Sequence, residues 1–159
     1  MRFDDMQAVT ISMEMERRGA DFYRRAARVS KTAAVASLLD LLAREEDTHL
    51  EEFARLAERV RRGPARAYDE ELSAYLTAVA ADIVFPGGVV ELAGEGGLRD
   101  PAAVLQYAIR SEKDSILFYT ELSSRAADDS ARETFREILA AERGHLARLL
   151  ALLEGLREG

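Results

Sequence analysis

The sequence predicts an all-α protein, a four-helix bundle in which a long crossover joins the second helix to the third. Ala, Leu, Glu and Arg dominate the 159 residues, and apolar side chains recur at the spacing of amphipathic helices. Gly and Pro, which interrupt helices, concentrate between residues 63 and 101. This length can bury a core, so we expect one domain over residues 1–159.

Two helices joined by a short connection are predicted in the first part of the chain. The first spans residues 5–29. The second begins near Ser30 or Thr32, both suitable N-caps, and ends at Gly63 and Pro64, because proline cannot continue the helix. The apolar stripes of these helices are Val9, Met13, Ala20, Tyr23 and Ala27, and Leu39, Leu42, Phe53, Leu56 and Val60.

The crossover over residues 64–100 is expected to contain one short helix, at about residues 69–84. Clusters of helix breakers follow at residues 85–88 and 94–97. The segment is too short to hold a core of its own, so we interpret it as a connection rather than a domain boundary.

Two more helices are predicted in the second part of the chain. The third opens at Asp100 and Pro101, an N-cap acid followed by proline at the first helical position. The fourth opens at Ser130, with Glu133 three residues later as a capping box. Their apolar stripes are Leu105, Ile109, Ile116 and Tyr119, and Phe135, Ile138, Leu149 and Leu152. Short, long and short connections suit the ferritin-like arrangement among four-helix bundles.

The second half of the chain repeats the first at an offset of 96 residues, which pairs residues 8–62 with 104–158. Within residues 8–50 and their partners, only six positions are identical. They pair Glu16 with Glu112, Phe22 with Phe118, Tyr23 with Tyr119, Glu46 with Glu142, His49 with His145 and Leu50 with Leu146. A duplication retained for packing alone would preserve apolar character rather than specific Glu and His residues.

Six polar residues stand in the apolar stripes without breaking the helical spacing. They are Glu16, Glu46, His49, Glu112, Glu142 and His145. In the second and fourth helices, Glu and His are three residues apart and therefore share one face. Four carboxylates facing one core cannot stay charged and unpaired, and no Lys or Arg lies on these stripes. Two divalent cations would balance the four charges.

This set of side chains has the ligand pattern of dinuclear carboxylate bundles, one Glu from each of two helices and Glu-x-x-His from each of the other two. Carboxylate and imidazole ligands suit two iron ions, and manganese or zinc would also fit. A single Glu-x-x-His would be weak, because most such pairs lie on the surface. The chain has only two histidines, and both follow a Glu by three residues at one repeat offset.

Tyr23 and Tyr119 follow the Glu of their own helix by seven residues, which is two turns along the same face. Two interpretations stay open at this point. Each tyrosine either packs as an amphipathic core residue or donates a hydrogen bond that orients a ligand carboxylate. We interpret Phe22 and Phe118 as packing residues.

Composition and charge argue against several functional classes. The net charge of −7 and the pI of about 5.0 disfavour a general nucleic-acid binder. The absence of cysteine excludes disulfides, iron–sulfur clusters, thiolate zinc sites and cysteine nucleophiles. No apolar run approaches the roughly 20 residues that span a bilayer, and the N-terminus lacks the apolar segment of a signal peptide. We therefore expect a cytoplasmic protein with no membrane or nucleic-acid partner.

At these residues the sequence resembles the rubrerythrin family of the ferritin-like superfamily. The resemblance is carried by residues 16–23 (ERRGADFY), 44–49 (REEDTH), 112–119 (EKDSILFY) and 142–145 (ERGH). It implies a non-haem di-iron site. Glu46 and Glu142 would bridge the two metals, Glu16 and Glu112 would be terminal ligands, and His49 and His145 would each bind one iron.

The sequence departs from rubrerythrins in two respects. Rubrerythrins carry a rubredoxin domain with four cysteines, and this chain has none, so an electron donor would be a separate protein. They also carry a carboxylate three residues after the Glu of the third helix, where this chain has Ser115. The resemblance implies an oxidoreductase that reacts with H₂O₂ or O₂, and by family habit a homodimer.

Two other functions stay open. A ferritin-type protein would take Fe(II) as substrate for oxidation and storage. A metal-free bundle that serves structure or partner binding would leave four carboxylates in the core unexplained. Helix exchange between subunits through the crossover is also compatible with the sequence.

Overall fold

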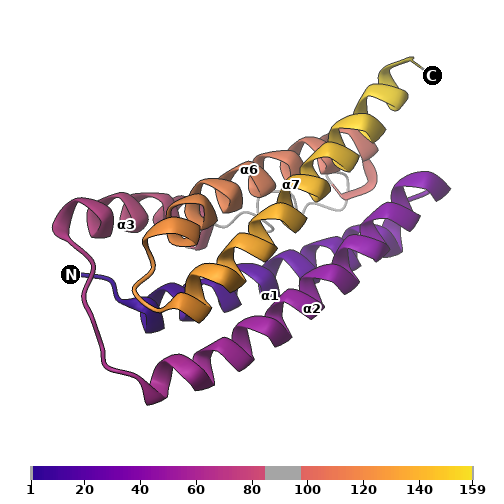
Figure 1. Ribbon diagram of the computed structural model, residues 1–159. Coiled ribbons are helices and arrows are strands. Elements are labelled where there is room, and N and C mark those ends of the chain that lie inside the picture. Colours follow the sequence, from indigo (N-terminus) through magenta and orange to yellow (C-terminus); the bar gives the residue numbers. More distant parts are fainter. Residues whose placement is uncertain (1, 85–97, 159) are drawn as a thin grey trace.

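The computed structural model describes residues 2–84 and 98–158, and the regular structure in them is helical (Figure 1). The helices are α1 (Asp5–Val29), α2 (Ala33–Arg62), α3 (Glu70–Val84), α6 (Pro101–Arg125) and α7 (Asp129–Glu158). The predicted all-α, ferritin-like four-helix bundle is therefore confirmed, with α3 as the short helix of the crossover. The predicted breakers at residues 85–88 and 94–97 lie outside the described residues. No described helix is both long and apolar enough to cross a membrane.

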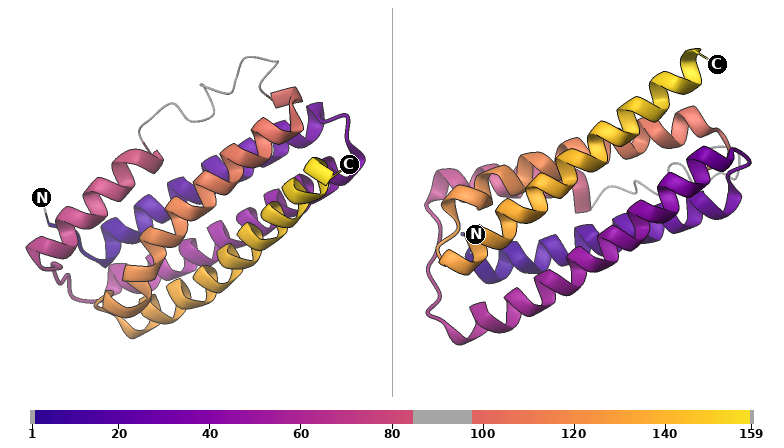
Figure 2. Two further views of the ribbon diagram at one scale, coloured as in Figure 1. Left: turned by 90° about the horizontal axis from the view of Figure 1, so that it is seen from above. Right: turned by 45° about the vertical axis from the view of Figure 1, so that its right-hand side comes forward.

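The bundle consists of two antiparallel helix hairpins, α1 with α2 and α6 with α7 (Figures 1 and 2). The hairpins meet where α2 packs against α7 and α1 packs against α6. The additional helix α3 lies along α6 and α1, on the side away from α2 and α7 (Figure 2). Each hairpin corresponds to one half of the internal repeat, so equivalent residues face each other across the bundle.

The helix ends follow capping rules only in part, since α2 begins after Thr32, as predicted, but the Thr32 side chain makes no capping hydrogen bond. Asp100 accepts a hydrogen bond from the Ala102 amide and caps α6, as predicted. The prediction that Ser130 caps the last helix is wrong, because α7 begins at Asp129 and the carboxylate of Asp128 accepts from the Ala131 amide. The buried carboxylate of Asp5 accepts from the amide of Asp128 and so fixes the connection at this register.

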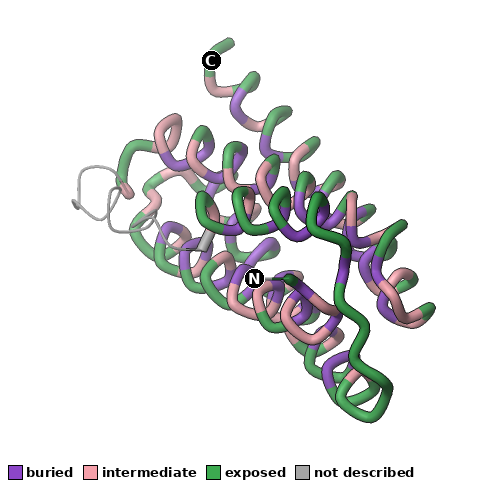
Figure 3. Tube along the Cα trace, turned by 90° about the vertical axis from the view of Figure 1, so that its left-hand side faces the viewer, coloured by how far each residue is buried: buried purple, intermediate pink, exposed green. Residues whose placement is uncertain are grey.

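Two apolar clusters fill the bundle, one on each side of a polar layer. Buried and exposed residues alternate along the helices, as amphipathic helices require (Figure 3). One cluster includes Val9, Phe53, Phe118, Tyr119, Phe135 and Ile138, and the other includes Phe22, Tyr23, Leu39, Leu42, Leu105 and Leu149. Every bundle helix contributes to both clusters. The stretch of each helix between its two contributions contains the polar residues that interrupt the predicted stripes.

Candidate metal centre

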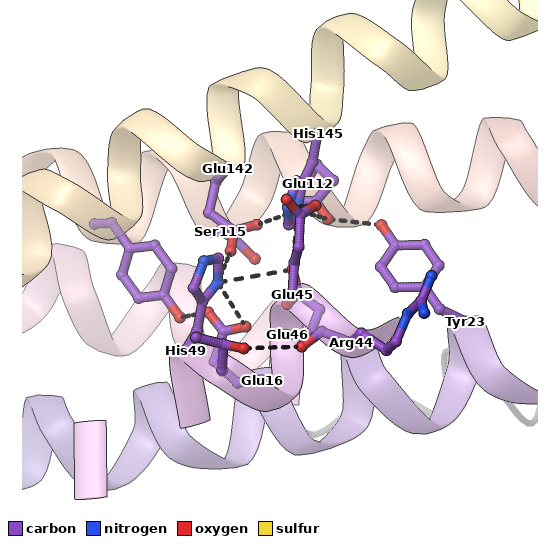
Figure 4. Close-up of polar contacts among 12 residues, drawn as sticks. Glu16, Tyr23, Arg44, Glu45, Glu46, His49, Glu112, Ser115, Glu142 and His145 are labelled. Carbon is purple, nitrogen blue, oxygen red and sulfur yellow. Dashed lines mark hydrogen bonds and ion pairs between the residues drawn. The ribbon is translucent and has the colours of Figure 1, made fainter. Parts of the chain in front are cut away.

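The six polar residues of the predicted site come together in one layer in the middle of the bundle (Figure 4). They are Glu16 on α1, Glu46 and His49 on α2, Glu112 on α6, and Glu142 and His145 on α7. All six are buried, and none is more than 6% exposed. Helical spacing explains this, because each residue occupies a position that an apolar side chain would otherwise fill on the inward face.

The six side chains form two overlapping groups that share Glu46 and Glu142. One group adds Glu16 and His49 to this pair, and within it one donor atom from each residue lies within 4.8 Å of the others. The other group adds Glu112 and His145, with the same spacing. The two shared carboxylates therefore stand between two candidate cation positions, and each position has its own terminal Glu and its own His.

Each histidine turns its Nδ1 atom toward the shared carboxylate of the opposite hairpin. His49 Nδ1 lies 3.0 Å from Glu142 Oε1, and His145 Nδ1 lies 2.9 Å from Glu46 Oε1. The first contact is a hydrogen bond, whereas the second has the distance but not the angles of one. The two rings stack with centroids 5.7 Å apart. The arrangement has an approximate two-fold symmetry that follows the sequence repeat.

The two tyrosines also follow this symmetry, and each one crosses to the other hairpin. The Tyr23 hydroxyl donates to Glu112 Oε1 at 2.6 Å, and the Tyr119 hydroxyl donates to Glu16 Oε1 at 2.9 Å. Seven residues correspond to about 10 Å of helix rise, so neither tyrosine reaches the Glu of its own helix. Because α1 and α6 are antiparallel neighbours, each tyrosine instead contacts the Glu of the neighbouring helix.

The carboxylates of the cluster lack the partners that their burial demands. Glu16 Oε2, Glu46 Oε1 and Glu112 Oε2 are buried with no hydrogen-bond partner. Among the described residues, no Lys or Arg forms an ion pair with any of the four glutamates. Burial, and then the neighbouring Glu142, raise the pKa of Glu46 well above its usual range and the pKa of Glu112 to about 8.

The histidines respond to the same crowding of negative charge in the opposite direction. Burial alone would lower their pKa, but hydrogen bonding to Glu142 and Glu16 raises the pKa of His49 to about 10. The pKa of His145 is likewise raised to about 10, mainly by Glu112 and Glu142. Burial and Glu16 raise the pKa of Glu142, yet its hydrogen bonds outweigh them and lower it overall. Without metal, protons therefore take the place of cations here.

Two residues near the cluster were not anticipated from the sequence. Gly19 packs so closely on Glu46 that a Cβ atom there would lie 3.1 Å from Glu46 Oε2. Glu45 places its Oε2 atom 3.0 Å from His145 Nε2 (Figure 4). The apolar stripes of the sequence do not indicate either residue, since both lie beside a stripe rather than on it. The hydroxyl of Ser115 donates to the Ser111 carbonyl of its own helix.

A small open pocket of about 230 Å³ lies beside the cluster, between α2 and α7. Its lining residues are Glu45, Thr48, His49, Glu52, Glu137, Ile138 and Ala141. Of the six residues in the cluster, only His49 contributes to this lining.

Comparison with known proteins agrees with this architecture. Residues 103–159 match the family model of rubrerythrins, which confirms the resemblance in the second half of the chain. A crystal structure described as a ferritin-like diiron-carboxylate protein from Thermotoga maritima superimposes with a TM-score of 0.71. The two chains are 24% identical over 97% of each, a likeness that establishes the fold. No curated protein sequence matches the chain.

Proposed function

We propose that this chain is a non-haem di-iron protein of rubrerythrin type, which reacts with peroxide or O₂ and draws electrons from a separate donor protein. One observation carries the proposal, the pair of four-residue groups that share Glu46 and Glu142 in the buried core. The match of the second half to rubrerythrins supports the same class.

The residues present fit two divalent cations. Three buried carboxylate oxygens and both ring nitrogens of His145 lack hydrogen-bond partners, so the cluster offers donor atoms that nothing else satisfies. Glu46 and Glu142 would be shared between the metals. Glu16 and His49 would serve one metal, and Glu112 and His145 the other. Oxygen and imidazole donors suit iron, with manganese and zinc as further candidates.

The chain's own residues set the conditions for redox chemistry at this place. When bound, a pair of ferrous ions supplies two electrons, one from each metal, which suits reduction of peroxide or O₂. Tyr23 and Tyr119 hold Glu112 and Glu16 in fixed orientations through their hydroxyl groups. The apolar clusters on both sides shield the layer from bulk water along the length of the helices. Since the chain has no cysteine, we assign electron supply to a partner protein.

A ferritin-type function is the alternative, with Fe(II) as substrate and Fe(III) as the stored product. The symmetric ligand set favours it, because Ser115 stands where rubrerythrins have a further carboxylate. The acidic surface would attract cations in either function. We propose a cytoplasmic homodimer without nucleic-acid or membrane partners, whereas a cage or large ring would favour storage.

The first test is the metal content of protein purified from iron-supplemented cells, followed by optical spectra of the reduced protein. Two irons per chain, with fast oxidation by H₂O₂ and slow oxidation by O₂, are expected for the rubrerythrin-type function. Fast oxidation by O₂ with continued uptake beyond two irons would support storage instead. If no metal binds, and Glu46→Ala and Glu142→Ala leave stability unharmed or improved, the di-iron proposal is wrong.

A further inference from the structure

The two halves of the repeat differ just outside the cluster. The offset that pairs His49 with His145 also pairs Glu45 with Ala141, and Glu52 with Arg148. Each hairpin therefore presents different side chains around the outer edge of the histidine it faces. The paired residues differ in both size and charge, so the two ends of the symmetric cluster are covered from solvent by different side chains.

The His145 end is closed by a pair of charged residues. Glu45 Oε2 lies 3.0 Å from His145 Nε2, and Arg148 Nη1 lies 3.3 Å from the same oxygen. Glu45 bridges α2 to α7 at this point and stands over the outer nitrogen of the ring. His145 is 2% exposed.

The His49 end is open at the positions that are equivalent to Glu45 and Arg148 in the repeat. Ala141 has no side chain beyond Cβ, and it lines the pocket of about 230 Å³ together with His49. All contacts of His49 with charged residues run through Nδ1, so Nε2 has no carboxylate partner among the described residues. His49 is 6% exposed, and it is the residue of the cluster that lines the open pocket.

The pocket is lined by negative charge. Glu52 stands where the closed end has Arg148, and Glu137 stands where the closed end has Leu41. Glu45 also belongs to the lining, but its charge is paired with Arg148, so Glu52 and Glu137 are the carboxylates that act on the pocket, and no basic residue belongs to the lining. Clefts lined by one sign of charge focus the field and raise the local concentration of oppositely charged ions.

We propose that this pocket is the port through which divalent cations reach the cluster, and that they arrive at the His49 end. Ala141 keeps the port open, and Glu52 and Glu137 draw cations into it. The inference rests on the proposed dinuclear site and adds its route of loading. A neutral oxidant would gain nothing from the carboxylates, which is why the charge of the lining favours a cation as the occupant.

The test measures how fast metal-free protein takes up Co²⁺, followed by the visible absorbance of the bound ion in a stopped-flow instrument. Ala141→Glu combined with Glu52→Arg rebuilds the closed end over His49. We expect this double variant to bind Co²⁺ at least about 10-fold more slowly than the wild type, with unchanged stoichiometry at equilibrium.

A second variant removes charge without adding bulk and keeps the test informative if the first fails to fold. Glu52→Gln with Glu137→Gln is expected to slow uptake about 3- to 10-fold at low ionic strength, with the difference fading in high salt. Glu51→Gln with Glu133→Gln is the matched control, since both residues are exposed on the same helices and outside the pocket. The control should match the wild-type rate.

The outcomes separate this inference from the proposed function. Wild-type protein that binds no Co²⁺ would overturn both. Binding of two ions per chain, at a rate that the port variants leave unchanged, would overturn the port alone. A loss of rate equal in the control and in Glu52→Gln with Glu137→Gln would also overturn it, because overall charge rather than the port would then govern uptake.

Discussion

The two hairpins agree where the side chains face the cluster and differ where they face solvent. Glu, Tyr and His are identical at equivalent positions, and each tyrosine bonds the carboxylate of the other half. One layer further out, Glu45 corresponds to Ala141 and Arg148 to Glu52. The inner agreement follows from a charge balance that needs all six residues. The outer residues take no part in that charge balance, so side chains close one end of the cluster while the other end remains open.

The largest expected effect separates the two shared carboxylates, which sequence symmetry makes equivalent. Both Glu46→Gln and Glu142→Gln should reduce metal binding from two ions per chain to one or fewer, because each side chain serves both groups. In the metal-free protein, the two variants should differ in their free energies of unfolding. The raised pKa of Glu46 means that its neutral form is already favoured, so Glu46→Gln should cost little stability.

Glu142→Gln should instead destabilise the metal-free protein by about 2–4 kcal/mol, because each histidine loses one of the two carboxylates that support its charge. Metal analysis and urea unfolding at pH 7 measure the two effects. Equal unfolding free energies for the two variants would mean that the cluster is symmetric in its energetics as well as in its sequence.

The next expected effect concerns pH. The stability of the metal-free protein should fall as the pH rises, whereas metal binding should become tighter. His49 and His145, with pKa values raised to about 10, contribute stability that is complete below about pH 6.5 and lost as the pH rises through 10. Glu112, with its pKa raised to about 8, also binds a proton that the unfolded chain has released by pH 7. The lowered pKa of Glu142 matters only in acid.

Metal-free protein should therefore lose thermal stability steadily between pH 6.5 and 10. Protein with saturating Co²⁺ should not, since the metals replace these protons and bind more tightly as the ligands deprotonate. Scanning calorimetry with and without metal measures both curves. A metal-free melting temperature that rises over this pH range would contradict the protonation states described for the cluster.

Much of this site could be predicted from the sequence because its residues obey helical periodicity. Glu16 and His145 interrupt apolar stripes at fixed spacing, so a one-dimensional pattern places them in the core. Glu45 and Gly19 obey no such pattern, since their importance depends on which helix lies opposite. The hydrogen-bond partners of Tyr23 and Tyr119 could not be predicted for the same reason, since they belong to the neighbouring hairpin. The cap of α7 is a different case, because Asp128 and Ser130 are both suitable N-caps in the sequence and only the structure shows that Asp128 accepts from the Ala131 amide.

The third expected effect tests whether the asymmetry reaches the terminal carboxylates. Tyr23→Phe and Tyr119→Phe each remove one donor to a buried Glu without changing packing volume. Loss of such an orienting hydrogen bond should weaken metal affinity about 10-fold in both variants. Competition titration with a chelating dye measures the affinities. Values that differ between the variants by much more than the error would show that the open end alters Glu16 and His49 as well as the access to them.

The smallest expected effect compares two glycines inside helices, one against the cluster and one away from it. Alanine stabilises a helix interior by up to about 1 kcal/mol relative to glycine, so Gly144→Ala should gain this amount, since nothing lies within 4 Å of its added methyl group. Gly19→Ala should lose most of that gain, because its methyl group would lie 3.1 Å from Glu46 Oε2. It should also weaken metal binding severalfold, whereas Gly144→Ala should not. Unfolding and dye competition measure both variants, and equal affinities would mean that Glu46 can shift without cost to the ligand set.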